Sequence, residues 1–271
     1  FKLLNKGITS IRYNSLNLPS ALQFANGNST DYLYGADGMK RRVTHKTAIA
    51  NISVPMGQIK ELASSQISQT NTTDYCNNVI YENGVLSMIL TEEGYVTLSG
   101  DAPIYHYYLK DHQGNNRVVI NQASTVEQIN HYYPFGGLFE VNTTTSGIQS
   151  YKYNGKELDR IHGVDWYDYE ARMYDGALGR FTTVDPLTEK YYSTNLYAYC
   201  KNNPINRIDP DGKDDYLLEP RGRLHNCTPY AQRGKSGVDK LHSYSGNSKS
   251  PMGKSITVKS GLLSQMLEVQ K

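Results

Sequence analysis

Short runs in which apolar and polar residues alternate recur throughout residues 1–212. In runs such as YVTLS (95–99) and RVVIN (117–121), every second side chain falls on the same face, which is the period of a β-strand. A Tyr-x-Tyr pair often opens such a stretch, and a glycine-centred turn and then a basic residue follow it. The pattern predicts a series of consecutive β-hairpins.

Three copies of this hairpin pattern are clear and three are weaker. The clear copies are YLYGADGMKRR (32–42), YHYYLKDHQGNNRVV (105–119) and YDYEARMYDGALGR (167–180). The weaker copies cover residues 80–90, 131–140 and 151–159. Dipeptides that tolerate positive φ stand at the expected turns, namely Asp37-Gly38, Asn83-Gly84, Asn154-Gly155 and Asp175-Gly176.

A series of hairpins has a consequence for the whole fold. One hairpin is marginally stable alone, so successive hairpins must pair edge to edge, and a long sheet twists and curls to protect its edges. The sequence therefore predicts an all-β protein whose tyrosine-rich hairpins form a curled sheet or part of a β-shell. Two polar segments, 60–75 and 142–150, are interpreted as loops or edge insertions.

The composition is unusual in its high tyrosine content. The chain has 23 tyrosines against 5 phenylalanines and 1 tryptophan. Tyrosine suits a sheet with one wet face, because its ring packs while its hydroxyl finds a polar partner. We therefore expect the tyrosines to cover many half-buried positions rather than to fill one deep core.

Length and charge exclude several classes of function. With 271 residues and a net charge of +2, the chain shows no strong attraction to nucleic acid or to membranes. No apolar run of 18 residues exists, so no membrane span is predicted. The chain opens at Phe1 without a signal peptide or an initiator methionine, and we expect it to be a fragment or a processed piece.

No metal or cofactor site is predicted. Cys76, Cys200 and Cys227 are widely spaced and odd in number, which favours ordinary reduced thiols. His106 and His112 match no metal-ligand spacing. Two Gly-Lys-Ser triplets in the tail lack the earlier glycine that a phosphate-binding loop requires.

Two Asp-Pro pairs, Asp185-Pro186 and Asp209-Pro210, stand 24 residues apart. Proline fixes φ and removes a donor, which favours a defined turn at each aspartate. The separation allows the chain to return and bring the two turns together. From spacing alone, a pair of structural turns is the plainer interpretation, because Asp-Pro commonly opens turns. After Gly212 the chain becomes basic and Gly/Ser-rich, so an irregular tail is expected.

Several motifs in residues 151–212 carry a resemblance to a known family. In order, they are YNGKELD, YDYEARMYD, LGRFTTVDPL and YAYCKNNPINRIDPDG. They resemble the Rhs repeat-associated core domain of bacterial polymorphic toxins and of the C subunits of insecticidal toxin complexes, most closely in versions from Bacteroidetes. The hairpins of residues 1–150 resemble YD repeats of Rhs proteins. The resemblance implies three parts: YD repeats (1–150), a core domain (151–212) and the start of a variable effector region (213–271).

The resemblance also implies a mechanism. In the family, the repeats form a hollow β-shell around a C-terminal toxin, and the core domain closes one end and cuts the chain after a DPxG motif. By motif position, the resemblance makes Asp185 and Asp209 the paired acids and Arg172 the supporting basic side chain, which holds one carboxylate ionised, and it places the cut between Lys213 and Asp214. Two carboxylates held close share a proton, as aspartyl proteases require. The family often has leucine where this chain has Lys213.

The implied partners are the chain's own C-terminal segment, a secretion apparatus and a cognate immunity protein, and the implied location is secreted or on the cell surface. Self-cleavage would be a single-turnover autoproteolysis. Two alternatives remain open. One is a surface or wall-associated module that binds carbohydrate or a neighbouring cell without catalysis. The other is a truncated remnant with too few repeats to close a shell.

Overall fold

The computed structural model describes residues 4–50, 52–139, 149–191, 194–218 and 224–226. Most of the predicted loop 142–150 and the tail from residue 227, with Cys227 and both Gly-Lys-Ser triplets, lie outside these residues. The described residues form β-strands joined by turns and by single-turn 3-10 helices, which confirms the predicted all-β class. None of the helices within the described ranges is long and apolar enough to cross a membrane.

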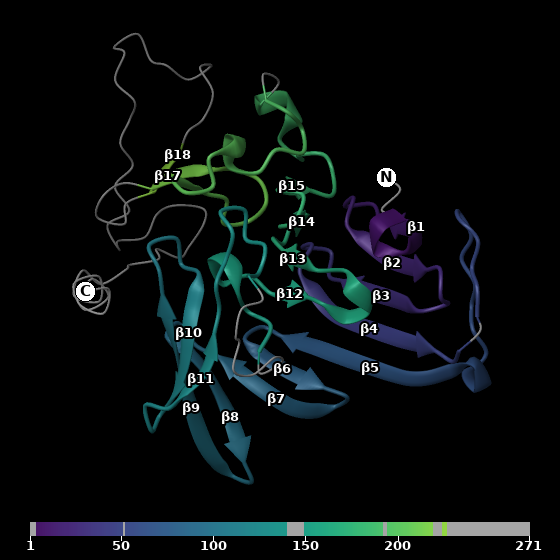
Figure 1. The fold of residues 1–271 in the computed structure, drawn as a ribbon, viewed down its shortest axis with the longest axis horizontal. Helices are drawn as coiled ribbons and strands as arrows, with labels where there is room; N and C mark the ends of the chain where they lie inside the picture. Colours follow the sequence, from purple (N-terminus) through teal and green to yellow (C-terminus); the bar gives the residue numbers. More distant parts are fainter. Residues whose placement is uncertain (1–3, 51, 140–148, 192–193, 219–223, 227–271) are drawn as a thin grey trace.

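The hairpins of the first half form one antiparallel sheet of 11 strands in sequence order, β1 to β11. The strands are β1 (Ile8–Tyr13), β2 (Pro19–Phe24), β3 (Ser29–Tyr34), β4 (Lys40–Ala48), β5 (Ile67–Cys76), β6 (Val79–Glu82), β7 (Val85–Leu90), β8 (Gly94–Ser99), β9 (Ala102–Lys110), β10 (Asn116–Asn121) and β11 (Val126–Ile129). Each strand pairs with the next, and β1 and β11 do not pair with each other, so the sheet stays open. This arrangement confirms the predicted curled sheet of consecutive hairpins (Figure 1).

The turn predictions succeed where two strands are joined tightly. Asn83 and Gly84 adopt φ of 51° and 80° between β6 and β7, as a two-residue hairpin turn requires. Gly38 adopts positive φ between β3 and β4. The prediction at Asp175-Gly176 is wrong in detail, because the positive φ of that turn falls on Gly179. A Cβ there would lie 2.8 Å from the ring of Phe135, so the loop needs glycine at this later position.

The prediction of a loop or edge insertion over residues 60–75 is wrong for its second half. Residues Ile67–Cys76 form β5, the longest strand, which lies between β4 and β6. Its residues are half-buried or exposed on both faces, and several are threonines. Without a buried face there is no hydrophobic alternation to detect, and β-branched threonine with backbone pairing is enough to form the strand.

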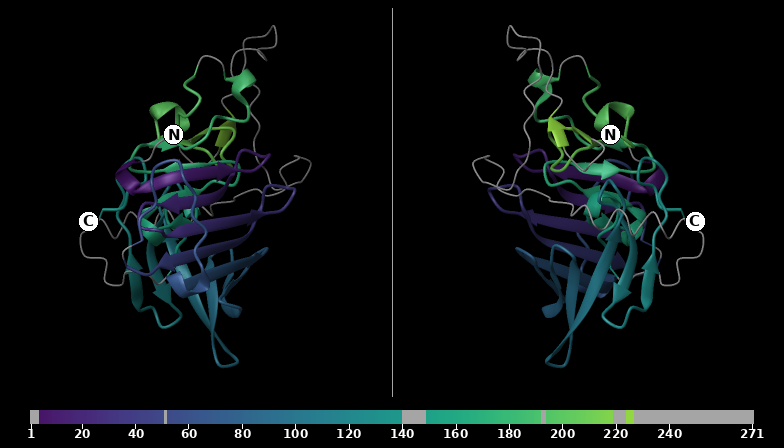
Figure 2. Two further views of the ribbon diagram at one scale, coloured as in Figure 1. Left: turned by 90° about the vertical axis from the view of Figure 1, so that its right-hand side faces the viewer. Right: turned by 90° about the vertical axis from the view of Figure 1, so that its left-hand side faces the viewer.

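Two smaller sheets follow. The first is antiparallel and has four strands, β12 (Leu158–Asp159), β13 (Trp166–Asp168), β14 (Met173–Asp175) and β15 (Arg180–Phe181). The second has three strands, β16 (Arg207–Ile208), β17 (Tyr216–Leu218) and β18 (Leu224–Asn226). The 11-stranded sheet curls beside the segment that carries β12–β15 (Figures 1 and 2).

A hydrophobic core joins the large sheet to the four-stranded sheet. Trp166 and Met173 of the small sheet pack with residues of β1 to β4, and Trp166 is 1% exposed. The partners from the large sheet are Ile8, Leu22, Phe24, Tyr32 and Val43. Burial of these side chains stabilises the fold by roughly 1.5–3 kcal/mol for each large residue. The concave face of the hairpin sheet therefore holds the segment beyond residue 150 in place.

Tyrosines form a second deep core, so the expectation that they cover only half-buried positions is wrong. Five are almost fully buried: Tyr153, Tyr167, Tyr169, Tyr174 and Tyr199. The hydroxyls of three of them donate to successive carbonyls of one loop, at Pro134, Phe135 and Gly136, over 2.8–3.0 Å. Because each of these three hydroxyls has an acceptor, their rings carry no desolvation penalty from an unpaired polar group.

A buried polar network also crosses from the large sheet to the small one. Lys40 of β4 lies 2.7 Å from Glu157 and 2.8 Å from Asp168, and its side chain is 9% exposed. The Tyr75 hydroxyl of β5 donates to Glu157 over 2.7 Å. Tyr32 of β3 donates to Asp159 over 2.8 Å. These contacts fix the orientation of β12 and β13 on the hairpin sheet.

Histidines in this interface make stability sensitive to acid. Burial and nearby Lys40 lower the pKa of His45 to about 4, against about 6.5 in an unfolded chain. His45 is 4% exposed, and its Nδ1 lies 3.0 Å from the Thr30 hydroxyl. The unfolded state therefore takes up a proton as pH falls below about 6.5, and the folded state takes it up only near 4, so stability is full above about 6.5 and is lost toward 4.

We expect the urea midpoint to fall as the pH is lowered from about 7 to about 5, with up to about 2 kcal/mol of the loss due to His45. His45→Gln should reduce this pH dependence. His112→Gln is the control, because the exposed His112 contacts only a backbone carbonyl. An equal pH dependence in the wild type and in His45→Gln would contradict the assignment.

Candidate functional site

The two Asp-Pro turns lie next to each other and have the same internal design. The Oδ1 atom of Asp185 accepts a hydrogen bond from the amide of Leu187 over 2.7 Å. The Oδ1 atom of Asp209 accepts from the amide of Gly212 over 2.7 Å and from that of Lys213 over 3.2 Å. In both turns one carboxylate oxygen organises its own loop, which leaves the other oxygen, Oδ2, free to face a shared partner.

That shared partner is Arg172, the residue directly before β14. Its Nη2 atom lies 3.1 Å from Oδ2 of Asp185 and 3.4 Å from Oδ2 of Asp209. The two oxygens therefore lie no further apart than the sum of these distances. The sequence prediction that Arg172, Asp185 and Asp209 come together is met by the geometry, while their chemical roles remain a proposal.

Arg172 is held on every side. It is 2% exposed, and its carbon Cζ lies 3.6 Å from the centre of the Phe181 ring. Its Nε donates to the Gly212 carbonyl over 2.6 Å, and Nη1 donates to the Leu196 carbonyl over 3.4 Å. One planar cation thus joins the hairpin to both Asp-Pro turns, in a fork geometry that lysine does not offer.

Glycine is needed at the end of the second turn. Gly212 has φ of 74°, and a Cβ there would lie 2.8 Å from the Tyr169 carbonyl and 3.1 Å from the amide of Arg172. The amide of Ala171 also donates to the Asp211 carbonyl over 3.2 Å. The DPDG turn is therefore pressed against the turn that presents Arg172, which explains why a small residue ends the motif.

The two acids differ in how their surroundings change the pKa. Burial raises the pKa of Asp209 to about 7, although Arg172 and the turn amides oppose the rise. Burial also raises the pKa of Asp185, against Arg172. The Asp185 side chain is 13% exposed and the Asp209 side chain 3%, and Asp185 is closer to the guanidinium. Of the two acids, Asp209 is thus the one whose protonated form burial favours more strongly.

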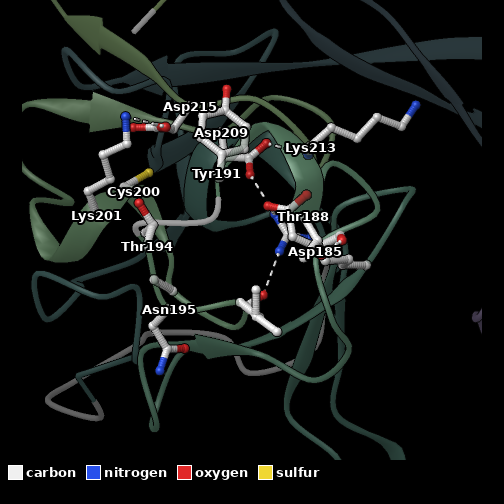
Figure 3. Close-up of a pocket in the computed structure, with 13 residues that line it drawn as sticks. Asp185, Thr188, Tyr191, Thr194, Asn195, Cys200, Lys201, Asp209, Lys213 and Asp215 are labelled. Atoms are coloured by element: carbon white, nitrogen blue, oxygen red, sulfur yellow. Dashed lines mark hydrogen bonds and ion pairs between the residues drawn. The ribbon is translucent and has the colours of Figure 1, made fainter. Parts of the chain in front are cut away.

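A small cavity opens beside the two acids. Its volume is about 20 Å³, and one water molecule needs about 10–15 Å³ by this measure. It is lined by Arg172, Asp185, Thr188, Tyr191, Thr194, Asn195, Leu196, Ala198, Cys200, Lys201, Asp209, Lys213 and Asp215. Figure 3 shows Asp185 and Asp209 on the same side of the cavity, and Lys213 beside Asp209. Both acids line this cavity, which has room for one water molecule.

The residue before the bond predicted to be cut lies at this cavity, and the residue after the bond is buried beside Lys190. Lys213 lines the cavity, and the Lys213 side chain reaches outward with 49% exposure. Asp214 is 9% exposed and lies 2.8 Å from Nζ of Lys190. The polar residue after DPDG therefore does not need burial, because it points its amine to solvent.

Within the described residues, the other candidate side chains do not come together in a nucleophilic or metal-binding site. Burial raises the pKa of the Cys200 thiol well above its ordinary value, which disfavours a thiolate nucleophile. Within the ranges that the structure describes, no three histidine, cysteine or acidic side chains group to hold a metal ion. His106 instead contacts Glu127 over 2.6 Å and Thr97 over 2.9 Å. Arg180 bonds to Asn202 and does not line the cavity.

Sequence reasoning missed the basic and aromatic side chains that lie at the cavity or next to it. Lys190 and Tyr191 follow the first Asp-Pro turn directly, and Lys201 precedes the second. Their only signal is the cationic and aromatic cluster EKYY (189–192), which by itself has no assigned chemistry.

Comparison with known proteins relates parts of the chain to toxin subunits. No protein-family model matches. Toxin subunit YenC2 of Yersinia entomophaga is 37% identical over 91 residues, which is 32% of this chain and 9% of that protein. Salivary gland surface protein 1 of Aedes aegypti is 37% identical over 110 residues, which is 40% of this chain and 3% of that protein. The chain thus spans less than a tenth of the length of both relatives.

Solved structures support the fold. A crystal structure of TcdB2-TccC3 matches with a TM-score of 0.55 and 20% identity, over 76% of this chain and 10% of that one. The Photorhabdus luminescens Tc holotoxin pore gives the same values. The chain is therefore similar in sequence to toxin subunits of Yersinia entomophaga, and it shares its fold with the matched part of TcdB2-TccC3.

Proposed function

We propose that this chain is the C-terminal part of an Rhs-family toxin protein, in which a shell of hairpins (1–150) and a core domain (151–212) enclose a C-terminal effector that begins in 213–271. The open, curled sheet supports this assignment, since further hairpins can continue it at its edges. Similarity to toxin subunits supports it independently. The secreted location, the secretion apparatus and the immunity protein come with the same assignment.

We further propose that the core domain cuts its own chain between Lys213 and Asp214. The observation that carries this function is the contact of Asp185 and Asp209 with one nitrogen of Arg172. The ionised Asp185 takes a proton from a water molecule, and the water oxygen bonds to the carbonyl carbon of Lys213. The protonated Asp209 donates to the carbonyl oxygen.

The tetrahedral intermediate then collapses. Its C–N bond breaks, the Asp214 nitrogen takes up a proton from the acid pair, and Lys213 ends in a carboxylate. Water is the only co-reactant. The segment from 214 becomes a separate chain that the shell retains by non-covalent contacts. The reaction occurs once per molecule, because the substrate bond is part of the same chain.

The pH dependence of the reaction tests this mechanism. Because burial raises the pKa of Asp209 to about 7, Asp209 holds its proton below that value and loses it above. The rate of self-cleavage should therefore fall about tenfold between pH ~6 and pH ~8. The measurement is a time course on a denaturing gel after refolding of the intact chain. A rate that rises over this range would contradict the protonated role of Asp209.

The alternative function, a surface module that binds carbohydrate through a tyrosine-lined face, has less support. Five tyrosines are committed to the interior of the core domain. Tyr105 and Tyr107 of β9 remain 45% and 42% exposed. These two side chains would contact the carbohydrate. Binding of an uncleaved chain to glycans on an array would favour that function instead.

A further inference from the structure

The two residues directly after the proposed cut are buried acids. Asp214 is 9% exposed and Asp215 is 8% exposed. Carboxylates are rarely buried unless cations or donors satisfy them. The structure supplies such partners for both, from different elements of the core domain. This arrangement needs an explanation, since residues at the end of a surface turn could have pointed to solvent.

Asp214 is held from the segment that follows Asp185. Nζ of Lys190 lies 2.8 Å from its Oδ1 and 3.1 Å from its Oδ2, and the Tyr191 hydroxyl donates to Oδ1. Lys190 ends η5 (Thr188–Lys190), which begins three residues after Asp185. The residue after the bond is therefore tied to the same short segment that presents one of the two acids.

Asp215 is held from the segment before Asp209. Nζ of Lys201, in η6 (Cys200–Asn202), lies 3.4 Å from its Oδ1. Nε of Arg207, in β16, donates to its Oδ2. Arg207 stands two residues before Asp209. The second acid after the bond is thus tied to the segment that presents the other member of the pair.

Both lysines contact one aromatic ring. Nζ of Lys190 and Nζ of Lys201 each lie 5.4 Å from the centre of the Tyr191 ring. Attraction between a cation and a ring face adds to the ion pairs and orders both side chains. Tyr191 is 6% exposed. These side chains therefore form one preorganised basic surface around the two acids. We call it the acidic subsite, because it holds acidic residues, and it consists of Lys190, Tyr191, Lys201 and Arg207.

We propose that the acidic subsite is a specificity site for two consecutive acidic residues on the C-terminal side of the cut bond, and that it positions this bond over Asp185 and Asp209. The inference rests on the proposed self-cleavage. Because each acid after the bond is fixed to the segment of one catalytic aspartate, the bond has little freedom to move away from the pair. The four residues of the subsite are positioning residues and do not touch the reacting atoms.

The subsite also explains why Lys213 is tolerated. An apolar residue before the cut could anchor the bond by its own burial, whereas the Lys213 side chain is 49% exposed and lies 3.8 Å from Asp211 of its own turn. Here the anchor lies on the other side of the bond, in Asp214 and Asp215. A misplacement of about 1 Å at a reacting centre costs about 100-fold in rate, so loss of the anchor should be visible in kinetics.

Charge reversal tests the subsite. Lys190→Glu should slow self-cleavage about 10- to 100-fold, and the double variant Lys190→Glu with Asp214→Lys should recover the rate to within about threefold. The matched control is Lys46→Glu, which removes a lysine that pairs with Asp31 on the exposed surface of the sheet. Thermal melting of each variant checks folding. Wild-type rates in Lys190→Glu, or no recovery in the double variant, would overturn the proposal.

A second readout does not require cleavage. In the uncut Asp209→Asn chain, the amides of Asp214 and Asp215 should exchange hydrogen slowly, and Lys190→Glu in that background should raise their exchange rates at least about tenfold. Unchanged protection would contradict the subsite. If Asp209→Asn cuts like the wild type, the proposed function fails; if Asp209→Asn stays intact while Lys190→Glu cuts normally, only the subsite fails.

Discussion

Asp209→Asn is expected to reduce self-cleavage by about 10³-fold, within the 10²–10⁴ range of general acid catalysis. The amide is almost isosteric, and its oxygen can still accept the hydrogen bonds from Gly212 and Lys213 that shape the turn. It cannot deliver the proton that burial holds on Asp209 near neutral pH. The fold should therefore survive while the chemistry stops. Cleavage is followed over days on denaturing gels, with thermal melting as the check on folding.

Asp185→Asn should have a comparable effect, because the pair lacks a base when this carboxylate is gone. The control is Asp165→Asn, which removes a carboxylate that pairs with Arg160 at the surface of the same domain. It should cut at the wild-type rate. If Asp209→Asn, Asp185→Asn and Asp165→Asn all cut equally fast, the two acids have no part in cleavage and the paired turns are purely structural.

Arg172→Leu is expected to lower the free energy of unfolding by about 3–5 kcal/mol. The guanidinium is the cation for one buried and one half-buried carboxylate, and it donates to two backbone carbonyls, at Gly212 and Leu196. Leucine fills part of the volume, but it leaves the acids facing each other and both carbonyls without this donor. Urea unfolding followed by tryptophan fluorescence measures the loss, since Trp166 is the single tryptophan and lies in the core.

Two matched variants make the result specific. Arg180→Leu changes an arginine eight residues away that bonds to Asn202 at the surface, and it should cost less than about 1 kcal/mol. Arg172→Lys keeps the charge and loses the fork, so its stability should lie between those of the wild type and Arg172→Leu. Equal stabilities of Arg172→Leu and Arg180→Leu would show that Arg172 does not hold the two turns together.

The fold was predictable from sequence wherever one face of a strand is buried. Alternation in residues 95–99 and 117–121 reports directly on β8 and β10, and Asn83-Gly84 reports on its turn. β5 gave no such signal, because its residues are half-buried or exposed and neither of its faces is fully buried. The tyrosine core was hidden for another reason. Tyr174 needs the Phe135 carbonyl, 39 residues away, and sequence does not show which distant acceptor a hydroxyl finds.

The candidate site was also predictable only in part. Asp185, Asp209 and Arg172 were predictable because family motifs contain them, and the proline after each acid fixes a local turn. The acidic subsite was not predictable. Its pairs, such as Lys190 with Asp214, join residues 24 apart through loops that have no repeating period. Only the folded arrangement brings their charges together.

The central claim is that two acids on one arginine direct a water molecule to the bond between Lys213 and Asp214. The most direct test is mass spectrometry of the wild-type chain after incubation in water enriched with heavy oxygen. The account predicts two fragments, one ending at Lys213 with heavy oxygen in its new carboxylate and one beginning at Asp214. A chain that stays intact, or one that breaks at Asp185-Pro186 or Asp209-Pro210 instead, would contradict it.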